Sequence, residues 1–99
     1  MERPLREGEG GPYGDLAHRI LPDGLVLVFM PSLAALLGHA EELTRAPLTE
    51  EQVLQIRDAA VVIVTQTQAA AAVEQSRGYA DVDPMQPWES WQAIRGDAG

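Results

Sequence analysis

The chain has no cysteine, no lysine and no asparagine among its 99 residues, and only five of its side chains are aromatic. Without cysteine it can form neither a disulfide framework nor a thiolate metal site or nucleophile. A chain of this length also has room for only one modest hydrophobic core. The lack of cysteine is compatible with a reducing compartment, and we expect a cytoplasmic protein.

Basic residues are also scarce. The seven arginines face fifteen acidic residues, so the formal net charge is −8. This balance leaves no basic stripe that could neutralise phosphates, and we expect no direct binding to nucleic acid or to an anionic membrane. Charge complementarity favours a protein partner that is itself basic.

Long hydrophobic runs are absent too. The longest apolar stretch, residues 25–37, is interrupted by Pro31 and Ser32. It is shorter than the roughly 20 residues that a membrane-spanning helix needs. Residues 1–24 contain five acids and three arginines, whereas a signal peptide requires a positively charged flank. We therefore expect a soluble protein without a signal peptide.

The sequence contains no recognisable catalytic or cofactor motif. No nucleophile elbow or phosphate-binding loop occurs, and His18 and His39 lack the spacing of a zinc site. Asp81 and Asp83 form an Asp-x-Asp pair without the other features of a calcium loop. We predict no catalytic residue, no metal site and no cofactor. An enzyme whose site forms at a homodimer interface, with a histidine or carboxylate as general base, is the alternative.

The first third of the chain is predicted to form a tail followed by a β-hairpin. Residues 1–16 are rich in glycine and proline and poor in apolar groups, which predicts a flexible tail. Residues 17–21 and 25–30 flank a Pro-Asp-Gly turn, which predicts a hairpin. Because every residue from 25 to 30 is apolar, we expect that strand to be covered on both faces.

Two helices are predicted after this hairpin. Ser32 is placed as the N-cap of an amphipathic helix that ends at about Arg45. Thr49 and Gln52 have the spacing of a capping box, which predicts that a second helix begins at Glu50.

The end of the second helix has two interpretations. Residues 61–64 are β-branched throughout, which favours a short strand between a helix at 50–60 and another at 66–77. The alternative is a single helix over residues 50–77, which would make the protein mostly α.

A last helix is predicted from about Pro87 to just before Gly96, followed by a C-terminal tail over residues 96–99. The fold class is therefore α+β, with an N-terminal β-hairpin and one short strand packed with about four helices. Residues 17–95 are expected to form one compact domain.

Aromatic side chains are concentrated near the C-terminus. Tyr79, Trp88 and Trp91 are three of the five aromatic residues and lie within a stretch of fifteen. Tyrosine and tryptophan are enriched at the energetic centres of protein interfaces, so these three residues form a candidate interaction surface. The alternative is that the rings seal the core of the domain.

Arg57 is the most unusual charged residue, because it lies between apolar positions of its predicted helix. An arginine in such surroundings usually meets a carboxylate, and we expect a structural ion pair between Arg57 and Asp81 or Asp83. This pair would fasten the C-terminal block to the helix. The alternative is a side chain whose charged head stays in water.

Several segments resemble the pattern of a group of small bacterial proteins of unknown function. These are PLTEEQV at 47–53, IRD at 56–58, RGYADVDP at 77–84, and the tryptophans at 88 and 91. The resemblance extends over residues 31–95. It implies that these blocks belong to one compact unit, and it implies no activity.

Size, charge and the aromatic block together favour a small acidic protein-binding module. Such a protein would inhibit, neutralise or regulate another protein, in the manner of an immunity protein or antitoxin. Besides the enzyme alternative, the chain could be a structural subunit whose exposed strand or tryptophan face closes a homo-oligomer.

Overall fold

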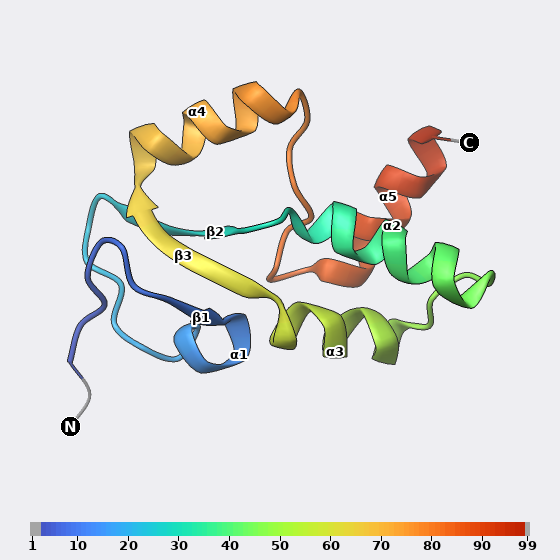
Figure 1. Cartoon of the computed structure of the whole chain (residues 1–99), viewed down its shortest axis with the longest axis horizontal. Helices are drawn as coiled ribbons and strands as arrows, with labels where there is room; N and C mark the ends of the chain where they lie inside the picture. The colour runs from blue at the N-terminus through green and yellow to red at the C-terminus, as the bar shows by residue number, and fades with distance from the viewer. Residues whose placement is uncertain (1–2, 99) are drawn as a thin grey trace.

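The computed structural model describes residues 3–98 and has an α+β fold (Figure 1). One antiparallel sheet contains β1 (Gly10–Pro12), β3 (Val61–Gln66) and β2 (Leu25–Phe29), in that spatial order. The helices of the described chain are α1 (Tyr13–Leu16), α2 (Leu33–Thr44), α3 (Glu50–Ala59), α4 (Thr67–Arg77) and α5 (Pro87–Ala98). None of these helices combines the length and the apolar composition needed to cross a membrane.

The α2 and α3 helices begin where the sequence predicts. The Ser32 hydroxyl accepts a hydrogen bond from the Ala35 amide at the start of α2. At the start of α3, Thr49 and Gln52 exchange both hydrogen bonds of the capping box. These short side chains satisfy amides that lack a partner within the helix, and they do so through local contacts alone.

The strand between α3 and α4 is also present, which excludes a single helix over residues 50–77. Ala60 ends α3 with an extended backbone, at φ −67° and ψ 138°. In β3, Val62 and Val64 are completely buried and their neighbours are partly or fully exposed. The β-branched run therefore forms a strand with one face in the core, as its residue types favour.

The β2 strand lies where the sequence predicts, but its partner is β3. The register runs from Leu25 opposite Gln66 to Phe29 opposite Val62. Residues 17–21 contain no strand. Because β3 offers a row of β-branched residues that is already held in the core, it is a better partner than the short segment before the turn.

Only one face of β2 packs against the core, which contradicts the expectation of a strand covered on both faces. The register places Leu27 and Phe29 on the core face together with Val62 and Val64. The opposite face carries residues that are partly or fully exposed, namely Val26, Val28, Met30, Val61 and Ile63. A three-stranded sheet with helices against one face leaves the other face accessible to solvent.

The N-terminal segment is part of the folded domain, which contradicts the predicted tail over residues 1–16. Leu5, Tyr13 and Leu16 retain 2%, 8% and 6% of their exposure, and β1 pairs with β3. The prediction failed because it relied on the high glycine and proline content of the segment. Burial of these three side chains offsets the conformational entropy that the segment loses on folding. Residues 1 and 2 lie outside the described part of the chain.

Polar contacts also hold this segment. The Glu9 carboxylate accepts a hydrogen bond from the Arg6 amide at 2.7 Å and lies 3.3 Å from the Arg19 guanidinium. The Arg6 hydrogen bond, assisted by the charge of Arg19, holds the pKa of Glu9 below its usual value. At the other end of the chain, α5 continues to Ala98, beyond the predicted end before Gly96. Of the predicted C-terminal tail, only residue 99 lies outside the described chain.

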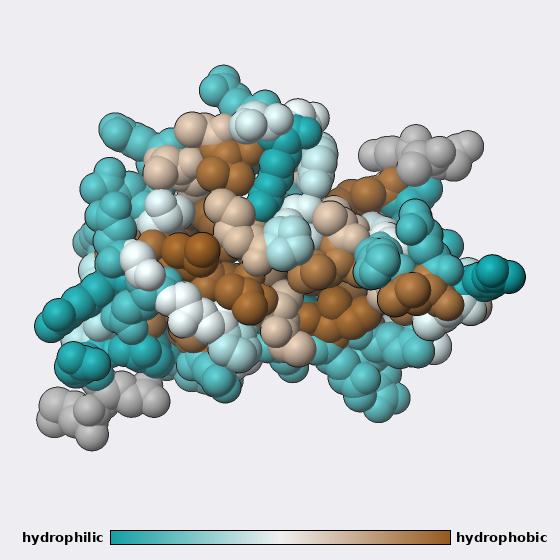
Figure 2. Space-filling model, viewed as in Figure 1, coloured by the Kyte–Doolittle hydropathy of each residue, from teal (hydrophilic) through white to brown (hydrophobic). Residues whose placement is uncertain are grey.

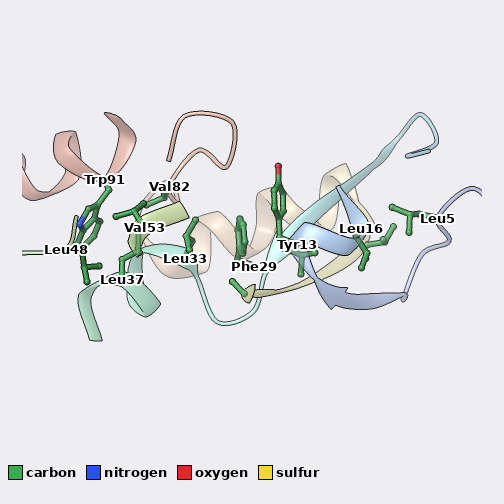
Figure 3. Close-up of a cluster of buried hydrophobic side chains, with 13 residues drawn as sticks. Leu5, Tyr13, Leu16, Phe29, Leu33, Leu37, Leu48, Val53, Val82 and Trp91 are labelled. Carbon is green, nitrogen blue, oxygen red and sulfur yellow. The ribbon is translucent and has the colours of Figure 1, made fainter. Parts of the chain in front are cut away.

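The hydrophobic core follows the long axis of the molecule (Figure 3). Leu5 and Leu16 lie at one end of the row, Phe29 and Leu33 lie near its middle, and Trp91 lies at the other end. Tyr13 stacks on Phe29 with ring centroids 5.5 Å apart. The principal extents of 41 × 30 × 20 Å fit a core that is long and thin, and such a core leaves much of the sheet near the surface.

Candidate functional site

A connecting segment, residues 78–84, leads from α4 back toward the start of α2 (Figure 1). Gly78 ends α4 with a left-handed backbone at φ 80°, and its amide donates to the Glu74 carbonyl at 3.0 Å. Glycine adopts this conformation without the strain that a side chain would add. The turn brings Tyr79 and Asp81 against the N-terminus of α2.

Asp81 is fixed at the start of α2. Its carboxylate accepts hydrogen bonds from the Leu33 and Ala34 amides, both at 2.8 Å. Arg77 lies on its other side, with a nitrogen 3.7 Å from the same carboxylate. A negative charge at a helix N-terminus is stabilised by free amides and by the helix dipole. Asp81 therefore fastens residues 78–84 to α2.

Arg57 does not pair with Asp81 or Asp83, which corrects the predicted ion pair. Its guanidinium instead donates to the Asp58 carboxylate and to the Pro84 carbonyl, both at 2.8 Å. It also lies over the Tyr13 ring, with its carbon 5.4 Å from the ring centroid. Arg57 still joins α3 to the C-terminal block, but through a backbone carbonyl.

Asp83 is occupied by its own turn. Its carboxylate accepts from the Met85 amide at 2.9 Å, and its amide donates to the Ser90 hydroxyl at 3.0 Å. An aspartate that bonds the backbone two residues later is typical of turns that precede a helix. The turn leaves the side chain near the start of α5, where it does not meet Arg57.

The three candidate aromatic residues have different surroundings. Trp91 is 6% exposed and belongs to the core, Trp88 packs partly buried against it, and Tyr79 is 44% exposed. The Tyr79 hydroxyl is hydrogen-bonded to the Ser32 hydroxyl at 2.8 Å. The Trp91 indole N–H is buried without a hydrogen-bond partner within residues 3–98. Tyr79 is therefore the ring that is both exposed and held in place.

Three depressions in the surface border Tyr79. One is a groove of about 190 Å³ between β2 and α4, and another is a hollow of about 360 Å³ between α2 and α5. The third, of about 610 Å³, lies between α4 and residues 78–80. Figure 2 shows apolar surface across the middle of the visible face, with polar side chains along its margins. We refer to the groove, the hollow and Tyr79 together as the Tyr79 surface.

The groove follows the outer edge of β2. Residues 26–29 line it in sequence, although successive side chains of a strand point to opposite faces of the sheet. Because residues from both faces of β2 line the groove, the groove lies along the edge of the strand. On the facing wall, α4 contributes one helical stripe of side chains, Ala70, Val73, Glu74 and Arg77.

The hollow has an apolar lining made by three elements. Its residues are Ala34 and Ala35 of α2, Tyr79 and Ala80 of the connecting segment, and Trp91 and Ile94 of α5. Three of these six residues are alanines, whose small side chains occupy little of the space in the hollow. A hollow of this composition suits one large apolar side chain of a partner.

The two histidines lie away from the Tyr79 surface. His18 and His39 are both exposed, and His18 borders a different shallow depression with Asp15 and Asp58. Over the described residues, no three histidine, aspartate or glutamate side chains are close enough to hold a metal ion. The charged groups at the groove are Glu74, Arg77 and Asp81.

No family model, curated protein or solved structure matches this chain. The resemblance to a group of small bacterial proteins therefore stays a prediction. Of the three predicted interaction residues, Tyr79 and Trp91 line the Tyr79 surface, whereas Trp88 is absent from the linings of the groove and the hollow. The α4 and β2 residues of the groove were not predicted. One sequence signal does point to the groove. Ala70, Val73 and Arg77 are spaced by three and four residues, so they share one face of the α4 helix.

Proposed function

We propose that this chain is a small acidic protein-binding module that holds a partner protein at the Tyr79 surface. It would act in the cytoplasm as an inhibitor, an immunity-type protein or another regulator. The observation that carries the proposal is the position of Tyr79, an exposed ring at the junction of a partly charged groove and an apolar hollow.

The fixed position of Tyr79 supports this role. Its hydroxyl is bound to Ser32, and the adjoining segment is held by Asp81 at the start of α2. A ring that is already ordered loses little conformational entropy on binding, which is one reason why tyrosine contributes strongly at interfaces. The alanine side chains around it leave room for a side chain of the partner.

The charge of the molecule supports a basic partner. The net charge is −8, and four of the seven arginines are paired with carboxylates, namely Arg19, Arg57, Arg77 and Arg95. Long-range attraction would speed the encounter with a basic protein. We expect the association rate to fall as salt is added, because ions screen charges beyond about 10 Å at 0.1 M.

Affinity capture with matched variants tests the proposal. The wild-type chain, Ala35→Glu and Gln55→Glu would each be immobilised and exposed to lysate of the native host, followed by quantitative mass spectrometry. Ala35 is exposed in the first turn of α2 and lines the hollow, so glutamate blocks the hollow while remaining compatible with the helix dipole. Gln55→Glu makes the same change in charge on α3, outside the Tyr79 surface.

The proposal predicts a protein that wild type and Gln55→Glu retain and Ala35→Glu loses. Circular dichroism and thermal unfolding would establish that Ala35→Glu is folded. Equal retention by all three proteins would contradict the proposed surface. Light scattering of the same samples covers the structural alternative: a dimer that Ala35→Glu converts to a monomer would identify the partner as a second copy.

A further inference from the structure

We infer that the free edge of β2 binds an extended segment of the partner as a fourth strand of the sheet, and that this segment alternates apolar and basic residues. The inference rests on the proposed function and specifies how the groove would be used. It follows from the hydrogen-bonding pattern of β2, from the construction of α4, and from the charges at the groove.

The hydrogen bonds at the two ends of β2 show which backbone groups face the groove. The Met30 amide donates to Val61, and the Gly24 carbonyl accepts from Thr67, so even-numbered residues face β3. In an antiparallel pair, the amide and carbonyl of every second residue bond to the neighbouring strand. The amide and carbonyl of Leu27 therefore point away from β3. Consistently, Val64, which lies opposite Leu27, directs its amide to Glu9 of the other neighbouring segment.

Most of this outward edge has no partner within the described chain. The Leu27 amide and carbonyl make no hydrogen bond to residues 3–98, whereas the Phe29 carbonyl accepts from Arg77 at 2.6 Å. An apolar edge strand with free amides and carbonyls is a template for another strand. The opposite edge offers little, because β1 is only Gly10–Pro12 and contains a proline.

The far wall of the groove can move at little cost. None of the side chains of α4 is buried. The helix is attached mainly at its ends, through bonds from Thr67 to the Gly24 carbonyl and from Arg77 to the Phe29 carbonyl. The groove of about 190 Å³ is narrow for a strand, so binding requires α4 to shift outward. Such a shift loses few buried contacts.

The same wall favours a single segment over a second copy of this chain as the occupant. The β2 strand of a second copy carries β3 along one side and α4 along the other. Two such edges reach the 4.7–4.9 Å spacing of paired strands only if both α4 helices move aside at once. A single extended segment has no such flanking elements, and it can enter the groove alone.

The charges at the groove specify the chemistry of the segment. Arg77 is already bound to Asp81 and to the Phe29 carbonyl. The carboxylate of Glu74, an exposed residue of the α4 wall, has no hydrogen bond or ion pair to any described residue. The groove therefore carries a net negative charge. Alternation of a strand places apolar residues against Val26 and Val28 and leaves every second residue free to be basic.

A synthetic peptide tests this inference without knowledge of the natural partner. The probe is an eight-residue peptide of alternating valine and lysine, blocked at both ends and titrated into the ¹⁵N-labelled full chain. Three controls accompany it. In the first, alternate amides are N-methylated, in the second, glutamate replaces lysine, and in the third, the residues are shuffled into a block of valine and a block of lysine.

The expected result is a shift of the Leu27 amide resonance and of its neighbours along β2 and α4. N-methylation should weaken binding about tenfold or more, because it removes the backbone donors while it preserves charge and side chains. Glutamate should abolish binding. Equal binding of the methylated peptide, shifts that lie outside β2 and α4, or no binding at millimolar concentration would each overturn strand addition.

Variants of the protein provide a second test that separates this inference from the proposed function. Leu27→Pro removes the outward amide at a position where an edge strand tolerates proline, and Leu27→Ala controls for the loss of the Leu27 side chain, which packs against the core. Circular dichroism would establish that both variants are folded, and only the proline variant should abolish peptide binding. Glu74→Gln should weaken it severalfold. If a natural partner is lost with Ala35→Glu but retained by Leu27→Pro, the Tyr79 surface binds it without an added strand.

Discussion

The two helices that flank β3 are almost equal in length and very different in role. The α3 helix has 10 residues, a complete capping box and a fully buried Val53. The α4 helix has 11 residues, no capping side chain and no buried residue. The α3 helix therefore contributes to the core, whereas α4 borders the groove without burying a side chain.

The sequence of α4 explains the difference. Four consecutive alanines, residues 69–72, favour a helix by intrinsic propensity but offer little surface to bury. The helix is instead held at its two ends by backbone carbonyls of Gly24 and Phe29. A helix that is anchored at its ends and free along its middle can border a binding groove.

The largest expected difference between the two helices comes from truncating one valine in each. Val53→Ala should lower the free energy of unfolding by about 2–3 kcal/mol, because it leaves a cavity in the core. Val73→Ala should lower it by less than about 1 kcal/mol, since Val73 is only partly buried and alanine is the better helix former. Urea unfolding of both variants measures this. Equal losses would mean that α4 belongs to the core.

The next effect concerns the segment that follows α4. Asp81→Ala should destabilise the protein by about 1–3 kcal/mol, because the Leu33 and Ala34 amides lose their acceptor. Hydrogen exchange should accelerate in α4 and residues 78–84 more than in α3. Asp81→Asn is the control, since its amide oxygen can still accept a bond. Uniform acceleration in both helices would show that Asp81 supports the whole fold rather than one wall of the groove.

The smallest contrast is expected at the helix starts. Thr49→Ala should cost about 1 kcal/mol, since it removes the side-chain acceptor of the capping box. Gln66→Ala, at the matching position before α4, should change the stability by no more than about 0.5 kcal/mol, because no side-chain cap is present there. Thermal unfolding of both variants compares the two. A cost at Gln66 equal to that at Thr49 would remove the distinction between a capped and an uncapped helix.

The predictions that the structure confirms concern contacts between neighbouring residues. The caps at Ser32 and Thr49 act within three residues of the chain. The β-branched run at 61–64 was correctly predicted to be a strand for the same reason. Such contacts connect residues that the chain already holds together, so their spacing is visible in the sequence.

Sequence reasoning failed where the partner is distant in the chain. The sequence predicts an aspartate partner for Arg57 because an arginine between apolar positions needs a hydrogen-bond acceptor. In the structure, the backbone carbonyl of Pro84 is such an acceptor. The N-terminal segment was predicted to be a tail because its composition is poor in apolar residues, yet three of them suffice to hold it. Composition averages over a segment, whereas burial depends on where each side chain lies.

The sequence by itself determined the helix starts, the strand at β3 and the small, acidic, cysteine-free character of the chain, because these depend on residue type and short-range spacing. Only the tertiary structure decided that Asp81 caps α2, that Trp91 is buried while Tyr79 stays exposed, and that β2 has a free edge beside α4. These features depend on which distant segments meet. Many pairings satisfy the same local preferences, and the competition for buried surface and for hydrogen-bond acceptors selects among them.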